Sequence, residues 1–437
     1  MKTARANSPA RLLKLTFCAF TLAFFAAALI APDRADMLPG LARILTGQAQ
    51  LTKDYFKPEL GGLSASMLNT ALLAAICTGL AFLPGVQVTG VTALAWFLTV
   101  GFGTYGMNPL NMLPLVLGVG AYSLIRREPF SKNVHFAMFA TGVSPIVTQV
   151  LLYYPSFESG PRVTPLGIAL TVIVSLLVGC ARPALCAHSP AFHKGHNLYN
   201  AGPAAGFLCF LIFAALYKTA GVEAPAIAAD LGEGHPRFVN LFCGICFALC
   251  LIAGLMLNGG LGDYGRLLKD SGYRSDFTQK YSAGSVLMNL GVYGLFILLY
   301  YNLIGAAFTG PTMGAVFCMV CCFAMGATPL NVLPIMVGYG LMGLLHRLGL
   351  VAFPVNSQAL VVGLCYASGL APVAGEFGPI AGIAAAMLHY ILVTSVPAIH
   401  GGFNLYNGGF TAGIVCFVFV PVLEHYFKSR TQKKMKA

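Results

Sequence analysis

The stretches PAFHKGHNLYNAGPAAGFLCF (Pro190–Phe210) and PAIHGGFNLYNGGFTAGIVCF (Pro397–Phe417) decide how this sequence is interpreted. They are identical at 13 of 21 positions without a gap, which chance does not produce even in a biased sequence. Self-similarity of this kind indicates two copies of one structural unit. The sequence therefore predicts that the chain consists of two related halves.

Shorter matches support the two-half interpretation, because they occur in the same order in both halves. They are NPLNMLP (Asn108–Pro114) with TPLNVLP (Thr328–Pro334), GVSPIVTQ (Gly142–Gln149) with GLAPVAGE (Gly369–Glu376), and the single asparagines Asn69 and Asn289.

The composition predicts an integral membrane protein. Of 437 residues, 57% are hydrophobic and 9% are charged, against about 25% charged in an ordinary soluble protein. A chain of this size cannot solvate its surface with so few charges, so lipid must cover much of it. The net charge of +12 comes from basic residues in short gaps between apolar runs, which excludes nucleic acid as a partner. Most of the 13 cysteines lie inside apolar runs and show no disulfide pattern.

Apolar segments follow one another along the whole chain, each long enough for a span of roughly 17–25 residues. The first follows a basic stretch that resembles a signal peptide, but the repeat gives it a counterpart, so we interpret it as a membrane helix. The 14 segments lie at residues 15–31, 60–82, 87–107, 109–125, 133–153, 164–186, 200–220, 237–259, 281–301, 304–326, 329–345, 357–375, 377–396 and 408–427.

Seven segments in each half place the halves in opposite orientation, because an odd number of crossings reverses the chain. The predicted fold is an all-α integral membrane protein of about 14 helical segments in two inverted-topology repeats, with broken or re-entrant helices. We expect repeat 1 at residues 15–220, a linker at 221–236 and repeat 2 at 237–427. Most basic loops fall on one side, which predicts that the N-terminus (1–14) and the basic tail (428–437) are cytoplasmic in a bacterial inner membrane.

The Pro-Leu-Asn motifs begin new helices. Asn108 and Thr328 are good helix caps, and the prolines that follow them favour a first helical turn. Such a motif is typical of a tight turn at the membrane surface, or of a broken helix whose N-terminal dipole faces a substrate. Both alternatives stay open. The second makes Asn111 and Asn331 candidate substrate-binding residues.

The Asn-Leu-Tyr-Asn motifs gather hydrogen-bonding side chains just before an apolar helix. Amides and phenols bind neutral polar solutes, or replace the water around an ion, without adding charge. The alternative is a polar structural cluster that caps helices and fixes loops. The candidate substrate-binding residues are His193, Asn197, Tyr199, Asn200, His400, Asn404, Tyr406 and Asn407.

A metal site is not expected at the neighbouring histidines. Of His188, His193 and His196, only His193 has a counterpart in the second half, and no thiol or carboxylate follows closely.

Glu376 is the acidic residue most suited to a coupling role, with Gln149 as its counterpart. It lies in an otherwise uncharged run, and an ionisable residue in a membrane segment is a functional candidate. The alternative is a loop carboxylate at the membrane interface. His389, which lies mid-helix, and its repeat equivalent Arg182 are candidate partners of this carboxylate.

The segment ILTGQAQLTKDYFKPELGGLSASMLN (Ile44–Asn69), together with the repeated motifs, resembles the domain of unknown function 1576 family. These are multi-pass membrane proteins of bacteria, so the resemblance implies a membrane location and no residue roles. Urea transporters, whose duplicated halves carry Asn-Pro-Leu and Tyr-Asn pieces, are a fainter likeness. The order and spacing of those pieces differ here.

The function expected from the sequence is a transporter or channel for a small polar solute or ion, bound between the halves. It is not an enzyme and uses no cofactor. Alternatives are an intramembrane enzyme built on the paired histidines, or a non-transporting scaffold. The expected partners are the lipid bilayer and the solute, and the glycine-rich surfaces fit a homo-oligomer or internal packing equally well.

Overall fold

The computed structural model describes residues 8–156 and 160–434, so parts of the predicted terminal segments, residues 1–7 of 1–14 and 435–437 of 428–437, lie outside it. Its regular structure is helical throughout these ranges, apart from one isolated bridge between Lys53 and Asp230. The predicted all-α fold class is therefore confirmed for the part of the chain that the structure describes.

The N-terminal half consists of α2 (Pro9–Ile30), α3 (Met37–Thr46), α4 (Leu63–Phe82), α5 (Gly90–Gly101), α6 (Pro109–Ile125), α7 (Val134–Ala140), α8 (Ser144–Thr148), α9 (Pro165–His193) and α10 (Ala201–Phe213). The C-terminal half consists of α11 (Pro236–Asn258), α12 (Tyr264–Leu268), α13 (Phe277–Lys280), α14 (Ala283–Leu303), α15 (Gly310–Val320), α16 (Pro329–Arg347), α17 (Gln358–Ala367), α18 (Ala371–Phe377), α19 (Pro379–Val393), α20 (Asn407–Tyr426) and α21 (Arg430–Lys434). Short 3₁₀ or π turns connect or extend them: η1 (Arg34–Asp36), η2 (Phe102–Thr104), η3 (Phe130–Lys132), η4 (Thr141–Val143), η5 (Gln149–Tyr153), η6 (Ala214–Thr219), η7 (Cys321–Ala324), η8 (Ser368–Leu370) and η9 (Val396–His400).

Ten helical segments of the described chain are long and apolar enough to cross a bilayer. Only 28% of the apolar window of α11 is buried inside the protein, although this helix is strongly apolar. Leu241, Ile245 and Leu249 on its surface are more than half exposed, which lipid explains and water does not. The protein is therefore a multi-pass membrane protein.

Four further apolar helices are too short for a full crossing, and three of them are shorter than the sequence predicted, whereas Pro109–Ile125 has its predicted bounds. They have 10–17 residues, and a full crossing needs about 20. Gly90–Thr104 and Gly310–Ala324 each end just before a glycine with positive φ, Gly106 (70°) and Gly326 (121°). Residues other than glycine rarely adopt this conformation. The four are Gly90–Thr104, Pro109–Ile125, Gly310–Ala324 and Pro379–Val393.

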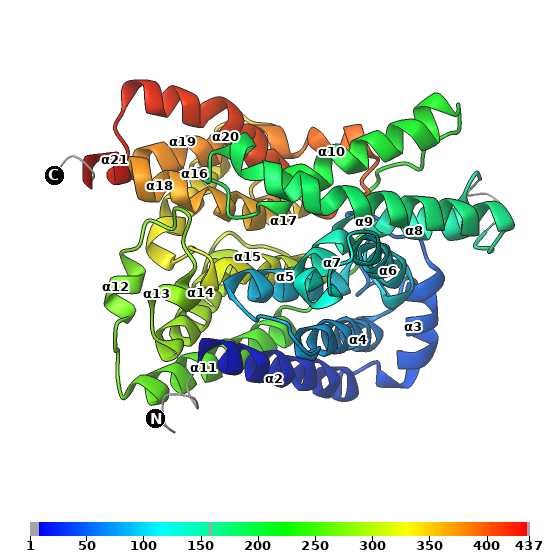
Figure 1. Cartoon of the computed structure of the whole chain (residues 1–437), viewed down its shortest axis with the longest axis horizontal. Coiled ribbons are helices and arrows are strands. Elements are labelled where there is room, and N and C mark those ends of the chain that lie inside the picture. Colours follow the sequence, from blue (N-terminus) through cyan, green and yellow to red (C-terminus); the bar gives the residue numbers. More distant parts are fainter. Residues whose placement is uncertain (1–7, 157–159, 435–437) are drawn as a thin grey trace.

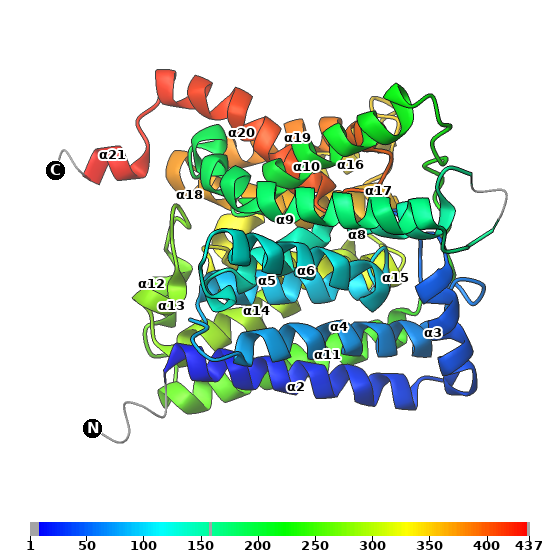
Figure 2. The same ribbon diagram turned by 45° about the vertical axis from the view of Figure 1, so that its right-hand side comes forward.

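Two helical hairpins form the lower layer in Figure 1. In the α2/α4 hairpin the Ser64 hydroxyl donates to the Ala28 carbonyl (2.7 Å). In the α11/α14 hairpin the Asn258 amide donates to the Ser285 hydroxyl (2.8 Å). Helix α2 runs from left to right in Figures 1 and 2, whereas α11 runs from right to left. Opposite directions are what inverted halves would require.

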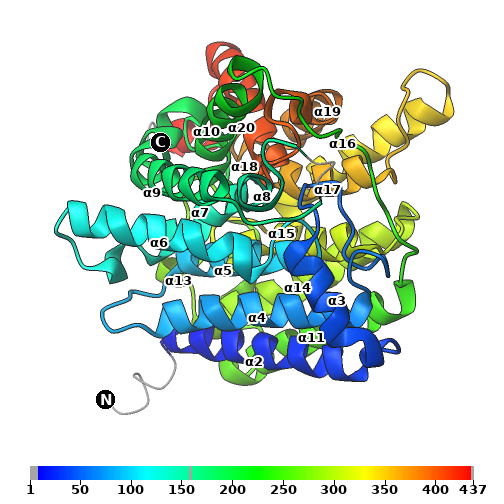
Figure 3. The same ribbon diagram turned by 90° about the vertical axis from the view of Figure 1, so that its right-hand side faces the viewer.

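The central helices α5 and α15 cross where neither has a side chain. A Cβ atom on Gly101 would lie 2.8 Å from the Gly314 carbonyl oxygen, and one on Gly314 would lie 2.3 Å from the Gly101 carbonyl oxygen. Around this crossing, α6 and α16 extend to opposite flanks of the molecule (Figure 3). The start of α2 and helix α21 lie at the same end of the molecule (Figure 1).

Each central helix breaks and a new helix begins at its Pro-Leu-Asn motif. Asn108 and Asn111 form a reciprocal capping box at the start of α6, and Thr328 and Asn331 form the same box at α16. The motif therefore begins a helix, as predicted.

The carbonyls released at each break are satisfied by one asparagine of the preceding hairpin. The Asn69 amide donates to the carbonyls of Gly103 (2.7 Å) and Met107 (2.8 Å). The Asn289 amide makes the same two bonds, both of 2.8 Å, to the carbonyls at the second break. Without water nearby, such carbonyls need a donor from the protein itself. The weakest pair in the sequence comparison therefore has a matched structural role.

Replacement of Asn69 by leucine should destabilise the protein by about 2 kcal/mol or more, because two buried carbonyls lose their donor. Asn289→Leu is the matched variant and should cost a similar amount. Unfolding of purified protein by dodecyl sulfate in mixed micelles measures both. A change below about 0.5 kcal/mol in either variant would contradict the proposed role of these amides.

Candidate functional site

The two Asn-Leu-Tyr-Asn motifs fold into the same local structure. His193 Nε2 lies 2.9 Å from Asn200 Oδ1, and His400 Nε2 lies 3.0 Å from Asn407 Oδ1. Each of these asparagines also donates to a backbone carbonyl of the preceding helix at 3.1 Å. Spacing alone produces this arrangement, since both motifs have the form His-x₃-Asn-Leu-Tyr-Asn.

Tyr199 of the first motif inserts into the C-terminal half. Its hydroxyl donates to the carbonyls of Cys318 (2.8 Å) and Cys365 (3.0 Å), and the Leu198 amide donates to the Gly369 carbonyl (2.9 Å). A Cβ atom at Gly369 would lie 2.4 Å from the Tyr199 ring. The glycine is therefore needed for the ring to pack against this helix break.

Tyr406 of the second motif makes the reciprocal contact with the N-terminal half. The Leu405 amide donates to the Gly142 carbonyl (2.8 Å), and a Cβ atom at Gly142 would lie 2.1 Å from the Tyr406 ring. Unlike Tyr199, its hydroxyl has no hydrogen-bond partner. The Arg182 guanidinium lies over the same ring, 5.4 Å from its centroid.

A cavity of about 580 Å³ reaches the first motif. Its polar walls come from the motif and from the loop between α12 and α13, which lies at the end of the molecule where α2 begins (Figure 1). A solute entering there would meet neutral amides, one imidazole, one guanidinium and one carboxylate. The lining includes His193, Asn197, Asn200, Arg274, Ser275 and Asp276, with Leu94 and Phe139 on the apolar side.

The second motif is covered by the segment between α3 and α4. Gln50 donates its side-chain amide to the Gly401 carbonyl (3.0 Å), and the Leu51 amide donates to the Gly402 carbonyl (3.0 Å). His400 is fully buried, with 0% of its surface exposed. The two Asn-Leu-Tyr-Asn motifs therefore lie in different surroundings. The first borders a cavity, and the second is covered by the segment between α3 and α4.

The structure separates the other predicted site residues from this cavity. Asn111 and Asn331 cap the helices α6 and α16. Gln149 is buried at the start of the turn η5, beside Tyr217. The Glu376 carboxylate accepts a hydrogen bond from the backbone amide of Thr431 in α21 (2.8 Å). This contact ties the broken helix α18 to the C-terminal segment.

Metal binding finds no support in the arrangement of ligands. Within residues 8–156 and 160–434, no three His, Cys, Asp or Glu side chains gather in a way that could hold an ion. His196 lies between the rings of Tyr273 (4.7 Å) and Phe377 (5.5 Å). Burial lowers the pKa of His196 to about 4, against the opposing effect of nearby carboxylates, so the ring is neutral at ordinary pH.

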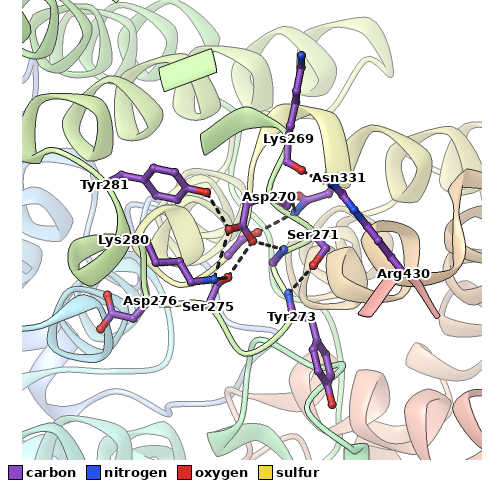
Figure 4. A network of polar contacts seen from close by, with 12 residues as sticks. Lys269, Asp270, Ser271, Tyr273, Ser275, Asp276, Lys280, Tyr281, Asn331 and Arg430 are labelled. Carbon is purple, nitrogen blue, oxygen red and sulfur yellow. Dashed lines mark hydrogen bonds and ion pairs between the residues drawn. The ribbon is translucent and has the colours of Figure 1, made fainter. Parts of the chain in front are cut away.

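A polar network around Asp270 fixes the loop that walls the cavity (Figure 4). The carboxylate accepts hydrogen bonds from the Gly272 amide (2.9 Å), the Ser275 hydroxyl (2.8 Å) and the Tyr281 hydroxyl (2.9 Å). Its own backbone carbonyl accepts from Asn331 (3.5 Å), which links the loop to the start of α16. Burial raises the pKa of Asp270, but these donors outweigh it, so the pKa lies below its usual value.

A family model for proteins of unknown function (DUF1576) matches residues 33–218 and 256–425. The chain belongs to this family. The match spans both halves and confirms the resemblance inferred from the sequence motifs. No curated protein and no solved structure matches the chain.

Three residues of the site have no signal in the repeat motifs. Arg274 comes from the long loop of the C-terminal half, and Phe139 is one of many apolar residues in its segment. Arg182 was noted as the counterpart of His389, but no ion pair joins it to Glu376 within the described ranges. Only the tertiary fold brings Arg274 and Phe139 to the cavity beside the first motif, and Arg182 to Phe139 and to Tyr406 of the second motif.

Gly142→Ala should destabilise the protein by about 1–3 kcal/mol, because the new methyl group overlaps the Tyr406 ring. Tyr406→Leu in the same chain should recover much of this loss, which a double-mutant cycle on unfolding midpoints would measure. Gly79→Ala is the control, since a Cβ atom there meets nothing within 4 Å. Additive effects of the two substitutions would show that the contact between the halves is not tight.

Asp270 should contribute to stability in a pH-dependent way. Because its pKa is lowered by folding, its contribution is complete above the unfolded value of about 3.9 and is lost as the pH falls through the folded value. The difference in unfolding free energy between wild type and Asp270→Asn should therefore be constant from about pH 5 to 8 and shrink below about pH 4. Denaturation in detergent at several pH values measures this difference. A gap that persists unchanged at lower pH would contradict it.

Proposed function

We propose that this protein is a transporter or channel for a small polar solute or ion, in the bacterial inner membrane with both termini cytoplasmic. The observation that carries the proposal is the difference between the two Asn-Leu-Tyr-Asn motifs. The first borders a cavity of about 580 Å³, and the second is covered by Gln50 and Leu51. A site reached from one end of the molecule and closed at the other is the arrangement that alternating access requires.

The arrangement of the halves supports the same proposal. The hairpins α2/α4 and α11/α14 run in opposite directions (Figures 1 and 2), and matched asparagines stabilise matched helix breaks. We interpret these features as an inverted repeat, in which exchange of the two local conformations would open the opposite end. Helix breaks near the centre of a bundle are a recurrent feature of secondary transporters.

Solute flux into liposomes tests the proposal directly. Purified protein is reconstituted, and uptake of small neutral solutes, cations and anions is compared with protein-free liposomes. Protein-dependent flux of at least one of them is expected. If a folded, correctly inserted protein moves none of them, the transport proposal is wrong.

The enzyme alternative rests on His193, which lies at the cavity. His193→Gln with His400→Gln removes both imidazoles while keeping amide groups in their places. Flux that survives this double replacement would argue against a histidine-based reaction.

A matched pair of variants locates the binding site. Asn200 and Asn407 make the same two hydrogen bonds, so replacing either by alanine should cost a similar amount of stability, about 1–3 kcal/mol. Only Asn200 lines the cavity. A transported solute should raise the unfolding temperature of wild type and of Asn407→Ala, but not of Asn200→Ala. Equal loss of the solute effect in both variants would show that this cavity is not the binding site.

A further inference from the structure

We infer that the solute is a small anion and that the guanidinium of Arg182 binds its charge. The inference rests on the proposed transport function and names the chemical class of its substrate.

Arg182 is a buried cation without a counter-charge. It lies near the middle of α9, and none of its surface is exposed. One nitrogen, Nη2, donates to the Phe139 carbonyl (2.9 Å), whereas Nε and Nη1 have no hydrogen-bond partner. No carboxylate of residues 8–156 or 160–434 forms an ion pair with it. A guanidinium cannot lose its proton, so its burial requires a partner that supplies negative charge.

The groups around Arg182 do not supply that charge. The Tyr406 ring faces the guanidinium, and the hydroxyl of this ring is itself unpaired. The Cys186 thiol is close enough to interact with the guanidinium, but a thiol is a weak acceptor. The Phe139 carbonyl lies near the C-terminal end of α7, where the helix dipole favours a cation. It accepts a hydrogen bond from only one of the three nitrogens of the Arg182 guanidinium.

Two residues that line the cavity also contact Arg182 or the following turn of α9. Phe139 lines the cavity, and its carbonyl is the one that holds the guanidinium. Asn200 also lines the cavity and donates to the Cys186 carbonyl, one turn beyond Arg182 on α9. At the cavity mouth, Arg274 forms no ion pair within the described part of the chain. The Asp276 carboxylate also lines the cavity, and it accepts hydrogen bonds from Thr278. An entering anion would therefore meet the Arg274 cation beside this carboxylate, and then the Arg182 cation beyond Phe139.

The helix breaks offer little to a cation. Carbonyls released where helices unwind are the usual ligands of coupling cations in transporters. Here those of Gly103 and Met107 accept the Asn69 amide, and the equivalent pair accepts the Asn289 amide. The unpaired nitrogens of Arg182, Nε and Nη1, are hydrogen-bond donors, and an anion requires donors.

His389, the counterpart of Arg182 in the C-terminal half, has hydrogen-bond partners for all its polar atoms. His389 Nδ1 lies 2.8 Å from the Tyr339 hydroxyl, and Nε2 lies 2.9 Å from the Gly408 carbonyl. Both ring nitrogens are thus paired inside the protein. At these two positions only Arg182 leaves donors for a ligand, which assigns the anion to the Arg182 position.

The first experiment is flux into liposomes with sodium salts of chloride, nitrate, formate, acetate and phosphate, with urea and glycerol as neutral probes. Wild type should move at least one of the anions. Arg182→Gln should reduce this flux about 10- to 100-fold, the loss that follows removal of a charge-assisted hydrogen-bonding partner. Transport of only neutral solutes or cations would overturn the anion inference and leave the transport proposal standing. The absence of any flux would instead count against transport.

Thermal unfolding in detergent separates binding from a structural role. In a buffer whose only anion is a bulky sulfonate, Arg182→Gln should unfold at a higher temperature than wild type, because an uncompensated buried charge is gone. Adding the active anion should stabilise wild type and Arg182→Lys but not Arg182→Gln. His389→Gln should lower stability and keep the anion response. If Arg182→Gln is less stable than wild type and wild type shows no anion response, Arg182 only caps α7 and the inference fails.

Discussion

The structure depends on an exchange of motifs between its two halves. Each Asn-Leu-Tyr-Asn motif packs on the glycine-containing break of the opposite half, through Leu198 on Gly369 and Leu405 on Gly142. The absence of a side chain at each glycine lets a tyrosine ring lie against the backbone itself. Close to these contacts, α10 and α20 meet at Gly202, where a Cβ atom would lie 2.4 Å from the carbonyl carbon of Gly409. Each half therefore fixes the position of the broken helix of the other half.

The sequence predicts the parts of this arrangement that depend on local spacing. The helix caps at Asn108 and Thr328 follow from residue type and an adjacent proline, and the pairing of His193 with Asn200 repeats wherever the motif does. The reciprocal contacts are different. The motif does not predict that the Tyr199 hydroxyl bonds the carbonyls of Cys318 and Cys365, because these residues are far away in sequence and take part through their backbone. The lengths of Gly90–Thr104 and Gly310–Ala324 were likewise missed, since hydropathy does not show where a glycine with positive φ ends a helix.

The inequality of the two motifs is also a tertiary effect. Both have the same hydrogen-bonding side chains, but the segment at Gln50 closes one of them and the loop at Arg274 borders a cavity at the other. These covering segments have no matching sequence, so alignment of the halves could not reveal which motif is accessible. Polar clusters with the same hydrogen-bonding residues thus differ in access because different segments cover them.

The positions of Arg182 and His389 extend this argument to charge. An imidazole can donate from one nitrogen and accept at the other, so two neighbours inside the protein satisfy it completely. A guanidinium only donates and always carries its charge. At the equivalent position it therefore keeps donors without a hydrogen-bond partner. At the two breaks before α6 and α16 neutral asparagine side chains satisfy the free carbonyls, whereas Arg182 keeps unpaired donors next to Phe139, a residue that lines the cavity. If the protein transports a solute as proposed, the asymmetry between the halves, rather than the repeat itself, would determine which kind of solute the interior accepts.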